Sequence, residues 1–196
     1  ATLTNANARK EAIYKKTVEL YPNDFRAYNN LGMMAYANGD LATAENYFKQ
    51  AASKNANAAE VNTNLGLIEL TKGNVANAET YLSKSTGANT ANEALGNLYI
   101  KQGQNDRAVQ AFGDTKTNSA ALAQILAKDY NKAKSTLSAV KNPDAYTNYL
   151  MAVVGARTNN ADLVKSSMDK VKQQDAALAA KAQNDREFAK YANEVK

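Results

Sequence analysis

Residues 25–58 read FRAYNNLGMMAYANGDLATAENYFKQAASKNANA, and their pattern of small and large residues recurs later in the chain. The second copy follows at an offset of 34 residues, and the third keeps the internal spacing after a connection that is four residues shorter. The recurring positions are Leu31, Gly32, Gly39, Ala44 and Phe48 in the first copy, Leu65, Gly66, Gly73, Ala78 and Leu82 in the second, and Leu95, Gly96, Gly103, Ala108 and Phe112 in the third. A fixed period of this length predicts an array of stacked repeats.

The first glycine of each copy is expected inside a helix, where that helix crosses its partner. Glycine costs about 0.5–1 kcal/mol relative to alanine in a helix, so close packing must offset the loss. We expect the small residue of the second helix, such as Ala44 opposite Gly32, to permit that approach. The second glycine, such as Gly39, is predicted to end the first helix in a left-handed conformation. The predicted N-caps of the second helices are Asp40, Asn74 and Asn105.

The pattern resembles the tetratricopeptide repeat, a helix-turn-helix unit of about 34 residues, and in particular the bacterial repeat proteins of that family. The aromatic residue and the Leu-Gly pair of the family's first helix are matched by Tyr28, Leu31 and Gly32. The small-large-small triplet of its second helix is matched by Ala44, Phe48 and Ala51. The resemblance implies an all-α fold, a right-handed α-α superhelix that is a solenoid of antiparallel helix pairs. It is specific over about residues 8–118 and architectural from there to the end.

We expect one solenoid domain over residues 1–196. Its expected parts are a half-repeat helix at 6–21, repeats at 25–58, 59–88 and 89–118, a truncated repeat at 119–141, a degenerate repeat at 143–172 and capping helices at 175–196. The half-repeat looks like the second helix of a unit whose first helix lies upstream. In the degenerate repeat Leu150 takes the place of glycine, which predicts looser or shifted packing. Asn184 and Glu187 are predicted to cap the last helix, and a polar surface suits a terminal cap, here Lys181, Gln183, Arg186 and Lys190.

The composition argues against catalysis. The chain contains neither cysteine nor histidine, which removes thiolate chemistry, the commonest metal ligand and the commonest general base. The glycines are too widely spaced for a phosphate-binding loop. The closest carboxylates, Asp185 and Glu187, are expected in the first turn of a helix, where negative charge is favoured. We therefore predict a protein that is not an enzyme, with no catalytic residues, no cofactor and no metal.

The charge and the hydropathy argue against two further classes of partner. The net charge of +5 is carried by basic residues scattered among acidic ones, which predicts solvated helix faces and no nucleic-acid binding. No apolar run approaches the ~20 residues of a transmembrane helix. The sequence indicates nothing about the oligomeric state.

The resemblance also implies where a partner binds. In the family the first helix of each repeat lines a concave face through its second, fifth, ninth, twelfth and thirteenth positions. The binding residues expected here are Arg26, Asn29, Met33, Tyr36, Glu60, Thr63, Leu67, Leu70, Thr90, Glu93, Asn97, Ile100 and Lys101, with Ala37 and Thr71 at the same positions. Because the floor of this groove is apolar and its border carries amides and charges, we predict a scaffold that binds a peptide or protein segment.

Two alternatives stay open. The groove residues could pack against another helix of the same chain, such as the tail, since a small solenoid is able to close over its own groove. The chain could also be a structural spacer module of a larger bacterial envelope protein, with a periplasmic or outer-membrane-associated location favoured over a cytoplasmic one. A carboxylate clamp, as in some members of the family, is not expected. Only Asn64 matches its pattern, and the other four positions are Asn29, Met33, Thr90 and Ala94.

Overall fold

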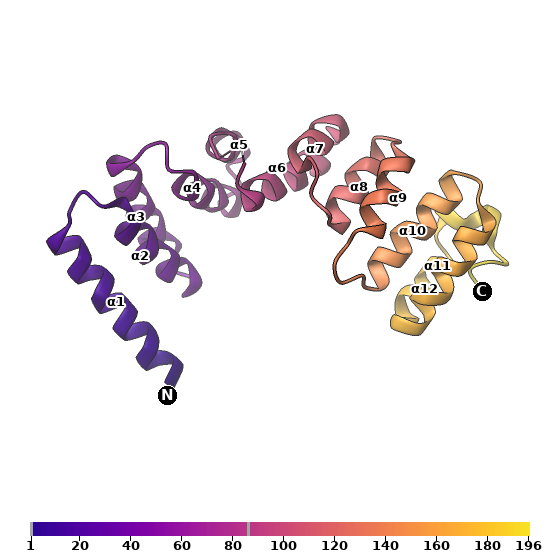
Figure 1. Ribbon diagram of the computed structural model, residues 1–196, viewed down its shortest axis with the longest axis horizontal. Coiled ribbons are helices and arrows are strands. Elements are labelled where there is room, and N and C mark those ends of the chain that lie inside the picture. The colour runs from indigo at the N-terminus through magenta and orange to yellow at the C-terminus, as the bar shows by residue number, and fades with distance from the viewer. Residues whose placement is uncertain (1, 86) are drawn as a thin grey trace. The chain divides into compact units, whose positions relative to one another are not determined.

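The computed structural model describes residues 2–85 and 87–196, and these residues form helices joined by short connections, with no strand among them (Figure 1). The helices are α1 Thr2–Leu20, α2 Phe25–Ala37, α3 Leu41–Lys54, α4 Ala59–Thr71, α5 Val75–Ser83, α6 Asn89–Lys101, α7 Asn105–Phe112, α8 Asn118–Leu126, α9 Tyr130–Ser138, α10 Ala145–Arg157, α11 Ala161–Gln174, α12 Ala176–Ala182 and the 3-10 helix η1 Arg186–Tyr191. The prediction of an all-α fold built from helix pairs is confirmed.

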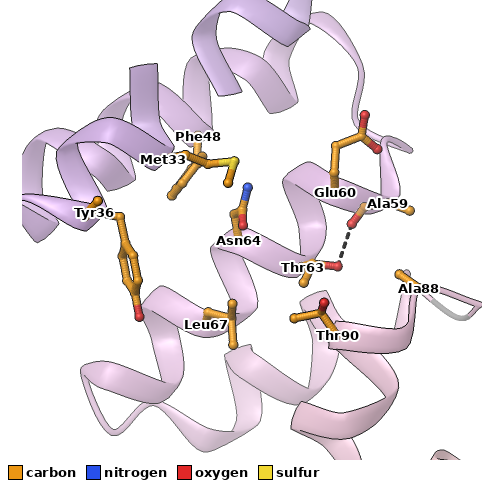
Figure 2. A pocket seen from close by; sticks show the side chains of 11 residues that line it. Met33, Tyr36, Phe48, Ala59, Glu60, Thr63, Asn64, Leu67, Ala88 and Thr90 are labelled. Carbon is orange, nitrogen blue, oxygen red and sulfur yellow. Dashed lines mark hydrogen bonds between the residues drawn. The ribbon is translucent and has the colours of Figure 1, made fainter. Parts of the chain in front are cut away.

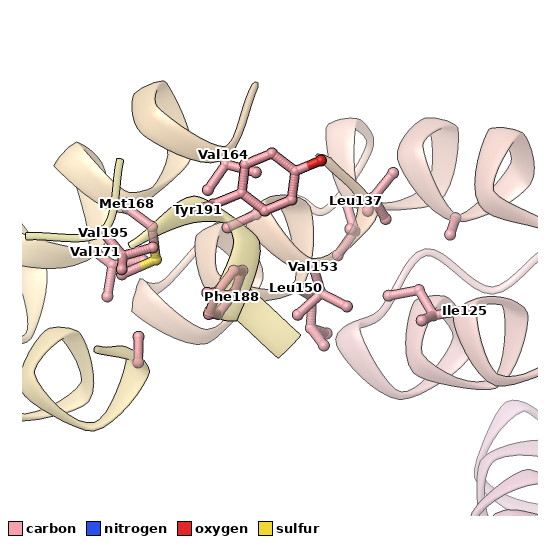
Figure 3. Packing of buried hydrophobic residues seen from close by; sticks show 14 of the residues in the cluster. Ile125, Leu137, Leu150, Val153, Val164, Met168, Val171, Phe188, Tyr191 and Val195 are labelled. Atoms are coloured by element: carbon pink, nitrogen blue, oxygen red, sulfur yellow. The ribbon is translucent and has the colours of Figure 1, made fainter. Parts of the chain in front are cut away.

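The chain folds into two compact units, Ala1–Ala94 and Leu95–Lys196. The boundary lies inside α6, the first helix of the third expected repeat. Each unit has a hydrophobic core of its own. The core of the first unit contains Tyr28, Ala35, Ala44, Phe48, Ala51, Ala58, Val61, Leu65 and Ile68. The core of the second unit includes Leu137, Leu150, Val153, Val164, Met168, Val171, Phe188, Tyr191 and Val195 (Figure 3).

Helices α2, α4, α6 and α10 have the same length, 13 residues, and each begins a helix pair. The eighth residue is glycine in the first three. A Cβ added at Gly32 would lie 2.6 Å from the ring of Phe48, and one added at Gly96 would lie 2.4 Å from the ring of Phe112. The glycine therefore makes room for the large residue of the second helix. The predicted approach of the small residue is present in the second repeat, where a Cβ added at Gly66 would lie 3.4 Å from the backbone oxygen of Ala78.

The fifth helix pair, α10 and α11, packs with a shift along the helix. Its eighth residue is Ala152, which is fully buried, so Leu150 does not take the place of the glycine as the sequence predicted. The two helices approach each other closely three residues further on, at Gly155. A Cβ added there would lie 2.9 Å from the backbone nitrogen of Val164. This contact lies three residues later than the glycine contact of the regular pairs, and Leu150 does not mark it.

The turn inside each of the five helix pairs has one residue with a positive φ angle. In three turns it is glycine, with φ of 80° at Gly39, 79° at Gly73 and 71° at Gly103, as predicted. In the other two it is Lys128 with φ of 65° and Asn159 with φ of 54°. A residue with a Cβ loses roughly 1–2 kcal/mol in the left-handed region. Asparagine adopts this region more readily than other residues with a Cβ, so the backbone strain falls mainly on Lys128.

The predicted N-caps of the first unit have different roles. Asp40 caps α3 as predicted, because its side chain accepts a hydrogen bond from the backbone nitrogen of Thr43 at 3.0 Å. Asn74 lies at the cap position of α5, but its Nδ2 donates to Oε2 of Glu69 at 2.9 Å instead of capping the helix. The side-chain amide of Asn74 therefore hydrogen-bonds the buried carboxylate of Glu69.

Two predicted N-caps of the second unit were wrong by one residue. The cap of α7 is Gln104, and Asn105 is the first helical residue. The cap of η1 is Asp185, whose carboxylate accepts a hydrogen bond from the backbone nitrogen of Glu187 at 2.9 Å. Helix ends are poorly determined by composition where several polar residues follow one another.

Candidate functional site

A pocket of about 580 Å³ lies in the first unit, on the face formed by α2, α4 and the start of α6 (Figure 2). Its lining consists of Met33, Tyr36, Ala37, Phe48, Ala59, Glu60, Thr63, Asn64, Leu67, Ala88 and Thr90. Six of the residues predicted to bind a partner meet there: Met33, Tyr36, Glu60, Thr63, Leu67 and Thr90. The spacing of the first helices brings these six together, since each lies at a groove position of its own helix.

The floor of this pocket is apolar and open to solvent. Met33 and Tyr36 are 52% and 41% exposed, which is high for large side chains that lie beside a hydrophobic core. Leu67 is half-buried, and Phe48, which lies beside Met33 in Figure 2, is 1% exposed. Most large apolar residues of a domain are buried against their own chain. An exposed apolar group in a concavity is therefore a typical binding surface.

Amides form one edge of the pocket. Nδ2 of Asn64, on α4, donates to Oδ1 of Asn29, on α2, at 2.8 Å. Oδ1 of Asn64 accepts no hydrogen bond from the described residues, and Asn64 lines the pocket. Asn29 is only 6% exposed, so it supports Asn64 from behind and does not itself face a ligand. The hydroxyl of Thr63 donates to the backbone oxygen of Ala59 at 2.8 Å.

The other predicted binding residues of the first unit lie outside this pocket. Arg26 is exposed and forms an ion pair with Asp24, with Nη2 at 2.6 Å from Oδ2. The hydrogen bonds from Arg26 lower the pKa of Asp24 to about 2. Leu70 and Glu93 are half-buried and do not contribute to the lining. A binding role for these residues stays a prediction.

Asn97, Ile100 and Lys101 were predicted to continue the groove along α6. All three belong to the second unit, whereas Thr90 and Glu93 belong to the first. Asn97 and Lys101 are exposed, and Ile100 is half-buried.

A second pocket, of about 240 Å³, lies between α1 and α2 in the first unit. Its lining is Asn7, Lys10, Tyr14, Asn30, Met33, Met34, Ala37 and Asn38. Met33 and Ala37 line both pockets, so the two hollows share a wall on α2. The sequence reasoning missed Lys10 and its neighbours because it placed the groove on the first helices of the repeats and α1 is not one of them. The helical spacing of Asn7, Lys10 and Tyr14 is the signal that could have found them.

In the second unit the tail of the chain packs on several of the groove positions of α10. Counted as in α2, these positions are Tyr146, Tyr149, Val153, Ala156 and Arg157. The ring of Phe188 meets that of Tyr149 edge to face, with the centroids 5.6 Å apart. The hydroxyl of Tyr149 donates to Asp185, and Nη2 of Arg157 donates to Oε2 of Glu187 at 2.8 Å. Burial and the neighbouring Asp185 raise the pKa of Tyr149.

The described residues hold no cluster of acidic side chains that could bind a metal ion. Within the part of the chain that the structure describes, no helix is both long enough and apolar enough to cross a membrane.

The sequence matches three family models, each described as a tetratricopeptide repeat. The matched ranges are 13–46, 35–93 and 90–113. Together they cover residues 13–113, more than half of the chain, with the glycines and large residues of the three regular repeats. The chain belongs to the tetratricopeptide repeat family.

Solved structures with the same fold agree with this assignment. YrrB, described as a TPR protein with an unusual peptide-binding site, has a TM-score of 0.67 at 19% identity, over 86% of this chain and 97% of its own. PilF of Pseudomonas aeruginosa has a TM-score of 0.72 at 13% identity, over 98% and 92%. PilW, a type IV pilus biogenesis factor, has a TM-score of 0.62 at 20% identity, over 96% and 92%. No curated protein matches the sequence.

Proposed function

We propose that the first unit binds a segment of a partner protein in the pocket formed by α2, α4 and the start of α6. The observation that carries this proposal is the exposure of Met33 and Tyr36 on the floor of a concave site. The tetratricopeptide fold generally serves as a scaffold for protein–protein interaction and not as an enzyme. YrrB, which shares the fold, is described as having a peptide-binding site. At that level of identity the support from YrrB extends to the fold, so the argument rests on the pocket.

The chemistry of the pocket suits a peptide with apolar side chains. Its volume lies within the range of about 300–1,000 Å³ that is typical of ligand sites. Fully burying one large apolar side chain contributes about 1.5–3 kcal/mol, and the thioether of Met33 adapts to irregular shapes. The free Oδ1 of Asn64 is placed to accept a hydrogen bond from a backbone N–H of the ligand. Apolar contacts would then provide affinity, and the amide would position the ligand backbone.

The experiment that tests the proposal uses peptides selected on the protein from a displayed random library. The selected peptides should be rich in large apolar residues, and the double variant Met33→Glu, Leu67→Glu should weaken their binding by at least about tenfold, because a charge is placed on the apolar floor. The matched control is Ile13→Glu, which changes a 61% exposed residue of α1 outside both pockets. Circular dichroism checks that the helices of each variant are intact.

Asn29 is unsuitable for this test because it is buried, and a charge there would destabilise the unit itself. If the selected peptides bind the double variant as tightly as the wild type, the pocket is not the binding site. The interpretation as a spacer module of an envelope protein, with its periplasmic or outer-membrane-associated location, stays a prediction that no feature of the two units favours.

A further inference from the structure

The two pockets of the first unit carry opposite charges on either side of α2. Lys10 of α1 lines the smaller pocket, and Glu60 of α4 lines the larger one. Helix α1 contributes nothing to the larger pocket and α4 nothing to the smaller, whereas Met33 and Ala37 of α2 line both. The apolar wall of α2 is therefore flanked by a cation on one side and an anion on the other.

Neither charge is paired with an opposite charge among the described residues of the unit. Both side chains belong to exposed residues, and neither forms an ion pair or a hydrogen bond with the described residues. Their neighbours behave differently: Lys15 pairs with Glu11 at 2.6 Å and Lys16 with Glu19 at 2.8 Å on α1. Glu60 also lies in the first turn of α4, where the helix dipole favours a negative charge.

We infer that the ligand of this groove is a dipolar peptide segment, with apolar side chains in its middle, an acidic side chain toward Lys10 and a basic side chain toward Glu60. This inference rests on the proposed function and adds the charge pattern of the partner. Complementary charge at the rim of an apolar site contributes specificity and association rate more than affinity. A surface ion pair is weak, so each matched end should change affinity only about two- to fivefold at low ionic strength.

The experiment uses four labelled synthetic peptides with the same central leucines and different ends. One has an acidic and a basic end, one has two acidic ends, one has two basic ends, and one has serine at both. Fluorescence anisotropy measures their dissociation constants, and the spacing between the ends is varied one residue at a time to find the best fit. Because the direction of the peptide in the groove is not specified, the design compares charge patterns and not sequence order.

Two charge reversals then switch the preference. The wild type should bind the dipolar peptide best. Lys10→Glu leaves two anions beside the groove, so it should prefer the peptide with two basic ends. Glu60→Lys leaves two cations and should prefer the peptide with two acidic ends. Arg9→Glu and Glu19→Lys are the matched controls, since each makes the same change of charge on α1 outside both pockets. They should keep the preference of the wild type, and roughly 1 M salt should abolish every preference.

The outcomes separate this inference from the proposed function. If the serine-ended peptide binds as tightly as the dipolar one, or if both reversals keep the wild-type order, the charge pattern is wrong while the pocket stands. If none of the four peptides binds the wild type, or if Met33→Glu, Leu67→Glu leaves their binding unchanged, the proposed function fails and the inference fails with it.

Discussion

The groove positions of α2 and α10 have opposite environments, although both helices have 13 residues and begin after an aspartate cap. In α2 the ninth and twelfth residues, Met33 and Tyr36, face an open pocket. In α10 the same positions are Val153, which is buried, and Ala156, which lies under the tail. The backbone oxygen of Ala156 lies 3.5 Å from the hydroxyl of Tyr191. The sequence left open whether the groove of the regular repeats is free or filled by the chain itself, and the filled arrangement occurs at α10, outside those repeats.

The side chains at the ninth and twelfth positions of α2 and α10 differ in size, and so does what covers them. In α10 the ninth and twelfth residues are the smaller Val153 and Ala156, aromatic residues of the tail pack against this helix, and Phe188 is 1% exposed (Figure 3). In α2 they are Met33 and Tyr36, and the described residues of the first unit leave the pocket open. The contact between α10 and the tail is thus an internal example of the kind of contact proposed for a partner of the first unit.

The largest expected effect comes from removing the aromatic residue that fills the groove of α10. Phe188→Ala should destabilise the second unit by about 3–5 kcal/mol, because it leaves a cavity in a closed core. Hydrogen–deuterium exchange should report faster exchange in α10 and α11. The affinity of the first unit's pocket for the selected peptides should stay unchanged. Equal loss of protection in α2 and α4 would show that the two units do not unfold separately.

A second effect concerns the eighth residue of the first helices, glycine in α2 and alanine in α10. Gly32→Ala should cost about 1–3 kcal/mol, because the new Cβ would overlap the buried ring of Phe48. Ala152→Gly should cost about 1–2 kcal/mol, from helix propensity and the loss of one buried methyl group, with no steric overlap. Urea unfolding of the two variants measures both numbers. A smaller loss for Gly32→Ala than for Ala152→Gly would contradict the packing role assigned to the glycine.

The turns of the helix pairs offer a third comparison, between glycine and residues with a Cβ at positive φ. Lys128→Gly should stabilise the second unit by about 0.5–1 kcal/mol, since relief of backbone strain exceeds the entropy that glycine loses on folding. Gly73→Lys should destabilise the first unit by about 1–2 kcal/mol. Thermal unfolding with site-resolved hydrogen exchange assigns each change to its unit. A destabilising Lys128→Gly would mean that the lysine side chain makes a stabilising contact.

The smallest expected effect is that the two units respond to opposite ends of the pH scale. In the first unit the pKa of Glu69 is lowered, first by the hydrogen bond from Asn74 and also by Asn77 and Lys72. The unfolded state then binds the proton more tightly, so this stabilisation is present above the usual glutamate pKa and is lost as the pH falls below it. Its size should be about 1 kcal/mol or less. Glu69→Gln should reduce the acid sensitivity of α4 and α5, measured by unfolding between neutral pH and pH of about 3.

In the second unit the pKa of Tyr149 is raised, first by burial and then by Asp185. The folded state then holds the phenolic proton more tightly, so this stabilisation is present below the usual tyrosine pKa and is lost as the pH rises above it. Tyr149→Phe should remove this alkaline loss, again about 1 kcal/mol, and Tyr21→Phe, at an exposed tyrosine of the first unit, is the control. Alkaline unfolding that is identical in the wild type and in Tyr149→Phe would contradict the role of this hydroxyl.

The regular helix pairs were predictable because their signals are local. The 34-residue period of the recurring leucine, glycine and alanine positions indicated where α2 and α3 lie. Gly39 marked the turn between them because glycine favours a positive φ. Six of the thirteen expected binding residues lie in one pocket because register alone places equivalent positions of successive helices side by side.

The remaining features depend on contacts between distant segments. No local rule places Lys128 at a positive φ, whereas asparagine is a known alternative to glycine just after a helix end, as at Asn159. The burial of Asn29 also depends on a distant segment. This residue was predicted to bind a ligand, but it is buried and accepts a hydrogen bond from Asn64 of α4. Lys10 belongs to the candidate site because α1 packs beside α2, which the sequence did not predict.

The amino-acid sequence by itself therefore determined the helices, their pairing and the repeat, because glycine at a helix crossing and a periodic apolar face act within about 34 residues. Only the tertiary structure decided which groove is open. Burial of Phe188 and Tyr191 against α10 depends on residues more than thirty positions apart, and no periodic pattern encodes such a contact. An apolar groove is filled by the chain itself only where another segment of the chain lies close enough to bury its side chains there. The tertiary structure decides whether such a segment is present.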